Sequence, residues 1–105
     1  MTVADWLRER APQPPARLTV SIEAALGDRV AAPREAATDA CLDAAESLLR
    51  DLLARSSAGR ESALDLLTVD ALVTYAFEAA AGDPSSLDGR ARHAAQRLAA
   101  TVDGG

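Results

Sequence analysis

Residues 61–81 constrain the fold more than any other part of this chain. They read ESALDLLTVDALVTYAFEAAA and contain neither proline nor glycine. At ~100° per residue on a helix, the leucines, valines and aromatic residues of this segment cover most of the circumference. A helix that is apolar over most of its girth is buried among several neighbours. We therefore expect an all-α fold, a small bundle of four to five helices in which this fourth helix is central.

The polar residues of this segment follow narrow stripes. One stripe is Asp70, Thr74 and Glu78, and another, on a different side, is Glu61, Asp65 and Thr68. A stripe lets a central helix carry acids without burying a bare charge, which is costly. We expect Asp70 to face solvent or to hold an arginine or a backbone N–H of a neighbouring helix. We interpret Asp70 as a structural residue, and replacing it by alanine is then expected to change stability more than any activity.

Proline and glycine divide the rest of the chain into four further segments. We expect helices at about residues 3–10, 14–26, 33–56 and 84–102, the third being the longest. The second segment also contains RLTVSIEAA, whose alternation fits a strand. With 105 residues, the chain is long enough for one domain, residues 1–105, and residues 103–105 are expected to fray.

Local signals mark the ends of these segments. Thr2 fits an N-cap with Asp5 in the first helical turn, and Gly27 and Gly82 fit helix ends. Asp83 and Pro84 fit the start of the last helix. Glu46 with Arg50, and Asp51 with Arg55, have the spacing of ion pairs along one helix.

Composition limits the possible partners and the location. The net charge of −5 disfavours nucleic acid and anionic membranes as partners. All eleven basic residues are arginine, which we interpret as the composition of a GC-rich bacterial genome. No apolar leader-like region or long apolar run occurs in the sequence, so we expect a cytoplasmic protein.

Three groups of residues are candidates for chemistry. Asp39, Asp43 and Glu46 share a helix face and could offer oxygens to Mg²⁺, although a solvated acidic face is the simpler interpretation. Cys41 and His93 could form a catalytic pair, but Cys41 falls on an apolar face and is expected in the core.

The third candidate group lies on the last helix. Arg90, Arg92, His93 and Arg97 could bind an anion or an acidic partner, or could form the polar back of an amphipathic helix. We assign no catalytic, cofactor-binding or metal-binding residue, and no cofactor.

The stretch LLTVDALVTYAFEAAA, residues 66–81, resembles the helix of trans-isoprenyl diphosphate synthases that follows their first aspartate-rich motif, written LLAGDALLTYAFE. The matching residues are Leu66, Leu67, Asp70, Ala71, Leu72, Thr74, Tyr75, Ala76, Phe77 and Glu78. The resemblance implies an all-helical, dimeric relative that binds allylic diphosphates through Mg²⁺. Upstream, SLLRDLL looks faintly like the start of that aspartate-rich motif, with Asp51 as its first aspartate.

The departures from the family pattern concern its catalytic residues. Leu52 and Arg55 stand where the motif needs aspartates, Val69 stands where the family has glycine, and no second motif is present. The resemblance therefore implies a reduced relative without the catalytic site. We expect a non-enzymatic helical protein that self-associates as a homodimer or serves as an accessory protein-interaction module. The alternative is a reduced isoprenoid-synthase-like protein that binds a prenyl diphosphate with Mg²⁺.

Overall fold

The structure is a computed structural model that describes residues 1–55, 60–82 and 95–101. Its main helices are α1 (Val3–Arg8), α2 (Ala16–Leu26), α3 (Ala37–Arg55) and α4 (Arg60–Ala81). Two short 3₁₀ helices, Gly27–Ala31 and Arg34–Ala36, connect α2 to α3, and a further helix spans 95–101. The described residues contain no strand beyond an isolated bridge between Thr2 and Pro33. The expected all-α bundle is confirmed.

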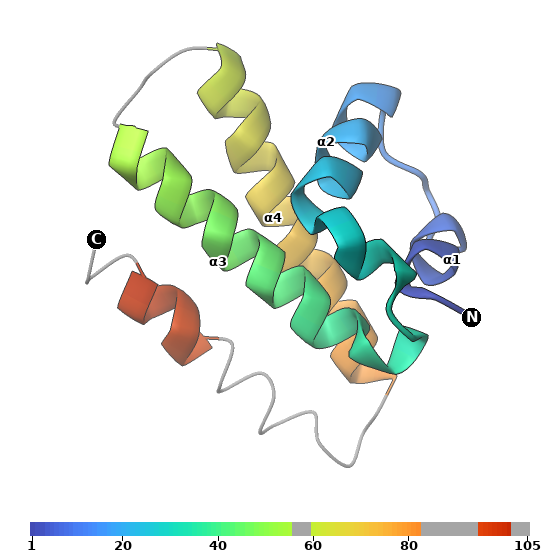
Figure 1. Cartoon of the computed structure of the whole chain (residues 1–105). Helices are drawn as coiled ribbons and strands as arrows, with labels where there is room; N and C mark the ends of the chain where they lie inside the picture. The colour runs from blue at the N-terminus through green and yellow to red at the C-terminus, as the bar shows by residue number, and fades with distance from the viewer. Residues whose placement is uncertain (56–59, 83–94, 102–105) are drawn as a thin grey trace.

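The long helices α3 and α4 lie side by side and antiparallel, and α2 packs against both of them (Figure 1). The helix at 95–101 lies along α3, on the side away from α2 (Figure 1). At the other end of the bundle, α1 packs near the turns that precede α3. The prediction that the fourth helix is central is confirmed, because α4 contacts α2 and α3 along its length and reaches α1 through Tyr75.

Small side chains fill most of the interface between α3 and α4. The buried apolar residues on these helices are Ala37, Ala40, Cys41, Leu42, Ala44, Ala45, Leu52, Leu72, Ala76 and Ala80. Because alanine adds little bulk, two helices whose facing positions are alanine can approach closely and still exclude water. Trp6 of α1 and Ile22 and Leu26 of α2 close the remaining side of the core.

The N-terminal segment is fixed by a reciprocal cap and by an aromatic contact. The Thr2 side chain accepts a hydrogen bond from the Asp5 N–H (3.2 Å), and the Asp5 carboxylate accepts one from the Thr2 N–H (3.0 Å). This capping box confirms the expected N-cap. The ring of Trp6 meets that of Tyr75 edge-on at 6.1 Å, and the Arg10 guanidinium lies 4.4 Å from the Trp6 ring.

Several expected boundaries are confirmed, and one prediction about the third segment is wrong. Pro15 is the N-cap of α2, which is a helix and not a strand, and Gly27 ends it with a φ of 56°, in the left-handed region that glycine tolerates. The third segment is not one helix from Pro33, because residues 34–36 form a separate 3₁₀ turn. As a result α4, with 22 residues, is longer than α3, with 19.

Two residues of one polar stripe of α4, Thr68 and Asp65, contact neighbouring helices. Thr68 is fully buried; its hydroxyl donates to the Leu64 carbonyl oxygen (2.8 Å) and shares a hydrogen bond with the Ser21 hydroxyl of α2 (2.7 Å). In the same stripe, the Asp65 carboxylate binds the Arg55 guanidinium at 2.8 Å. The expected ion pair of Arg55 with Asp51 is wrong, since Arg55 instead donates to the Asp51 backbone carbonyl (3.4 Å) and reaches across to α4. The pair of Glu46 with Arg50 is confirmed at 2.8 Å.

We predict that Thr68→Val lowers the free energy of unfolding by about 1 kcal/mol, because the buried Thr68 position loses its hydroxyl and the partly buried Ser21 hydroxyl loses its partner. Thr74→Val is a matched control, since Thr74 also donates to the carbonyl four residues earlier (2.9 Å) but is exposed. The control is expected to change stability by less than about 0.5 kcal/mol. Urea unfolding followed by circular dichroism measures both. Equal effects of the two substitutions would contradict the role given to the Thr68–Ser21 contact.

Candidate functional site

The acidic face of α3 is occupied by an arginine from the C-terminal helix. The Arg97 guanidinium donates to the Asp43 carboxylate and to Glu46 at 2.7 and 3.0 Å, and Glu46 also accepts from Arg50. The hydrogen bond that Arg97 donates to Asp43 has the largest effect and raises the pKa of Arg97; burial opposes this shift, and the hydrogen bond to Glu46 adds to it. Asp39, the third carboxylate of the predicted face, is exposed. Among the described residues, no three His, Cys, Asp or Glu side chains are placed to hold a metal ion.

This ion-pair cluster changes the interpretation of the last helix. The sequence predicts an anion site or the polar back of a helix for Arg97, whereas in the structure its guanidinium bonds to carboxylates of α3, more than 50 residues earlier in the sequence. Arg90, Arg92 and His93, together with Asp83 and Pro84, lie outside the described residues, as do most of the expected helix 84–102 and the expected frayed end at 103–105. No local spacing in the sequence could show the long-range pairing of Arg97.

We predict that Arg97→Gln releases the 95–101 helix from α3, because the Asp43 and Glu46 carboxylates of α3 lose the Arg97 guanidinium. Amide hydrogen exchange in 95–101 should become faster, and the free energy of unfolding should fall by ~1 kcal/mol. Arg50→Gln removes an exposed partner of the same Glu46 and provides the control, with a smaller expected change. Unchanged exchange in 95–101 after Arg97→Gln would show that apolar contacts alone hold this helix.

Cys41 is in the core, as expected from its position on an apolar face. Its side chain is completely buried between α3 and its neighbours, and burial raises the pKa of the thiol to about 12. A thiol that stays protonated at neutral pH is a poor nucleophile. Its suggested partner His93 lies outside the described residues.

We predict that the Cys41 thiol reacts with a disulfide reagent such as dithiobis-nitrobenzoate only as fast as the folded protein opens and exposes it. The reaction rate at pH 8 should therefore rise with urea in parallel with unfolding, with Cys41→Ala setting the baseline. A fast reaction in the absence of urea would show that the thiol is accessible and ionised in the native state.

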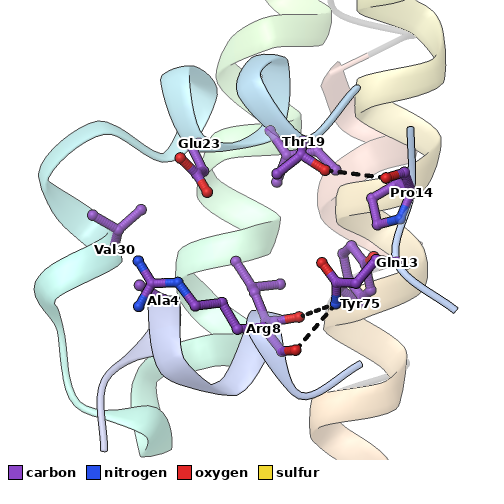
Figure 2. Close-up of a pocket in the computed structure, with 10 residues that line it drawn as sticks. Ala4, Arg8, Gln13, Pro14, Thr19, Glu23, Val30 and Tyr75 are labelled. Atoms are coloured by element: carbon purple, nitrogen blue, oxygen red, sulfur yellow. Dashed lines mark hydrogen bonds between the residues drawn. The ribbon is translucent and has the colours of Figure 1, made fainter. Parts of the chain in front are cut away.

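A small hollow lies between α1, α2 and Tyr75 of α4 (Figure 2). Arg8 and Glu23 lie on either side of its mouth, and Ile22, Leu7 and Val30 contribute apolar walls. The Gln13 side chain does not point a free amide into it, because that amide donates to the Leu7 and Arg8 carbonyl oxygens (3.0 and 3.2 Å). The volume is about 40 Å³, close to that of one water molecule, whereas ligand pockets measure ~300 Å³ or more.

Two larger hollows follow α2, and both are open troughs. One, of about 450 Å³, lies between α2 and Leu64, and the other, of about 340 Å³, lies between α2, α3 and Asp65. Ser21 and Ala24 line both troughs. In the second trough Asp65 is already paired with Arg55, and Ser47 and Asp51 supply further polar groups. Because both troughs are open, neither encloses a small molecule as ligand pockets do.

The outer face of α4 is the most apolar exposed feature of the described helices. Leu66 and Leu67 are 55% and 56% exposed and Phe77 is 40% exposed. The stripe of Asp70, Thr74 and Glu78 lies on the same face and is also exposed. Of the two expected arrangements, Asp70 therefore has the one in which it faces solvent. The Asp70 side chain forms no hydrogen bond or ion pair within the described part of the chain, although the Asp70 backbone carbonyl accepts from the Thr74 hydroxyl. The alternative, in which Asp70 holds an arginine or a backbone N–H of a neighbouring helix, is therefore not observed.

In comparisons with known proteins, the chain matches no family model, and no curated protein or solved structure matches it significantly. The resemblance of residues 66–81 to isoprenyl diphosphate synthases therefore stays a prediction. Of the aspartates it would use, Asp51 is exposed and Asp43 is bound by Arg97. None of the described helices combines the length and apolar character needed to cross a membrane.

Proposed function

We propose that this chain is a non-enzymatic, cytoplasmic helical module that binds a protein partner, either a second copy or another protein, through the exposed face of α4. The observation that carries the proposal is the exposure of Leu66, Leu67 and Phe77 on one helix. Covering apolar surface of this kind stabilises a complex by ~25 cal/mol for each Å² removed from water. Large apolar side chains gathered on an exposed face are typical of interaction sites.

The groups that could support catalysis are engaged in structural roles, which favours binding over chemistry. Arg97 occupies the carboxylates of Asp43 and Glu46, and Cys41 is buried with a raised pKa. The hollow beside Tyr75 is too small for a substrate. The outer face of α4, by contrast, is large enough to contact a helix over several turns.

The proposal is tested by substituting two apolar residues of the α4 face together, Leu66→Ser and Phe77→Ser. Self-association is followed by sedimentation, and binding of helical peptides with an apolar stripe is followed by fluorescence anisotropy; whichever of the two the wild-type protein shows should weaken about tenfold or more. Val20→Ser is the matched control, because Val20 is an exposed apolar residue of α2, away from this face. The proposal is contradicted if the wild-type protein neither self-associates nor binds any such peptide, or if the control weakens binding equally.

A further inference from the structure

Four residues form a seam along α4: Leu66, Asp70, Val73 and Phe77. Their spacing of four, three and four residues places them within ~60° of arc and along ~16 Å of the helix axis. This is the spacing of the a and d positions at which two helices meet in a coiled coil. Leu66, Asp70 and Phe77 are exposed, and Val73 is half-buried at the edge of the core. An aspartate thus occupies one of the two central positions of an otherwise apolar seam.

A second copy of the chain fits this seam poorly. In an antiparallel pair Leu66 would face Phe77 of the second copy, but Asp70 would press against an apolar valine. In a parallel pair the two Asp70 carboxylates would face each other. Residues 62–81 contain no basic residue, and position 60 lies ten residues from Asp70, ~15 Å along the axis. Either arrangement strips water from a carboxylate without giving it a partner, which is unfavourable.

We propose that the α4 seam binds an amphipathic helix of another protein that presents an arginine opposite Asp70. The planar guanidinium can donate two hydrogen bonds to the carboxylate, and its apolar stem can lie along the neighbouring leucine, valine or phenylalanine. Glu78, exposed on the same face, favours a basic partner in the same way. A seam of about three turns makes a small interface, so binding should be transient rather than permanent.

This inference rests on the proposed use of the α4 face and specifies the partner. The experiment uses designed helical peptides with leucine at the two outer seam positions and arginine, leucine or glutamate at the two central ones. One central residue then faces Asp70 in either orientation. The wild-type protein should bind the arginine peptide about tenfold or more tightly than the leucine peptide, and the glutamate peptide most weakly.

The substitution Asp70→Leu should reverse this preference. It should bind the leucine peptide more tightly than the arginine peptide, and it should dimerise at concentrations where the wild-type chain is monomeric. Asp70→Asn keeps the side-chain shape and should lose the preference for arginine. Asp39→Leu makes the same chemical change at an exposed acid of α3 and should leave peptide selectivity unchanged. Because Asp70 is exposed, circular dichroism should show that all three variants are folded.

The possible outcomes separate the inference from the proposed function. Equal binding of the arginine and leucine peptides, or wild-type dimerisation that Leu66→Ser abolishes, would overturn the arginine partner and leave the α4 face as a binding surface. If wild-type and Asp70→Leu neither bind a peptide nor self-associate, both the inference and the proposed function are wrong. Loss of selectivity in Asp39→Leu would show that total charge, and not the seam, determines binding.

Discussion

The close contact between α3 and α4 is the interaction on which the rest of this fold depends. The facing positions are mostly alanine, so the two helices gain stability from close approach and not from large interlocking side chains. Such an interface removes little apolar area for each residue. Trp6 of α1 and Ile22 and Leu26 of α2 add larger side chains that cover one side of the pair. Leu66, Leu67 and Phe77 on the outer face of α4 stay exposed.

Polar contacts fix the order in which the helices pack around this pair. The Thr68–Ser21 hydrogen bond joins α4 to α2, Asp65 joins α4 to Arg55 of α3, and Arg97 joins the 95–101 helix to α3. Each of these links connects two different elements. A buried hydroxyl or a partly buried charge is stable only with its partner in place, so each link also disfavours other arrangements of the same helices.

The all-α class and most helix boundaries could be predicted from the sequence because they follow from local signals. The capping box at Thr2, proline before α2 and the left-handed glycine at Gly27 each act within a few residues. The burial of Cys41 likewise follows from its place on an apolar helix face. The partners of Arg97 and Thr68 could not be predicted, since the residues they meet are 47 to 54 positions away and only the packing of helices brings them together.

The geometry of a single helix could also predict which residues share a stripe, but not which stripe faces outward. Asp70 and Thr68 both belong to polar stripes of α4, yet one is exposed and the other is fully buried. That difference is set by where α2 and α3 pack. Because the stripe of Asp70 faces outward, Asp70 is a charged residue within an exposed apolar seam and not a structural contact. This is the position at which we propose that it selects a partner.

The most direct measurement is a map of the amide chemical shifts of the isotope-labelled protein as the arginine peptide is added. If the outer face of α4 is the binding surface and Asp70 the selecting residue, the largest shift changes will lie around Leu66, Asp70, Val73 and Phe77, and Asp70→Leu will greatly reduce them. If the largest shift changes lie at Ser21 and Ala24 in the troughs along α2, the outer face of α4 is not the binding surface. If the shift changes persist undiminished in Asp70→Leu, Asp70 is not the selecting residue.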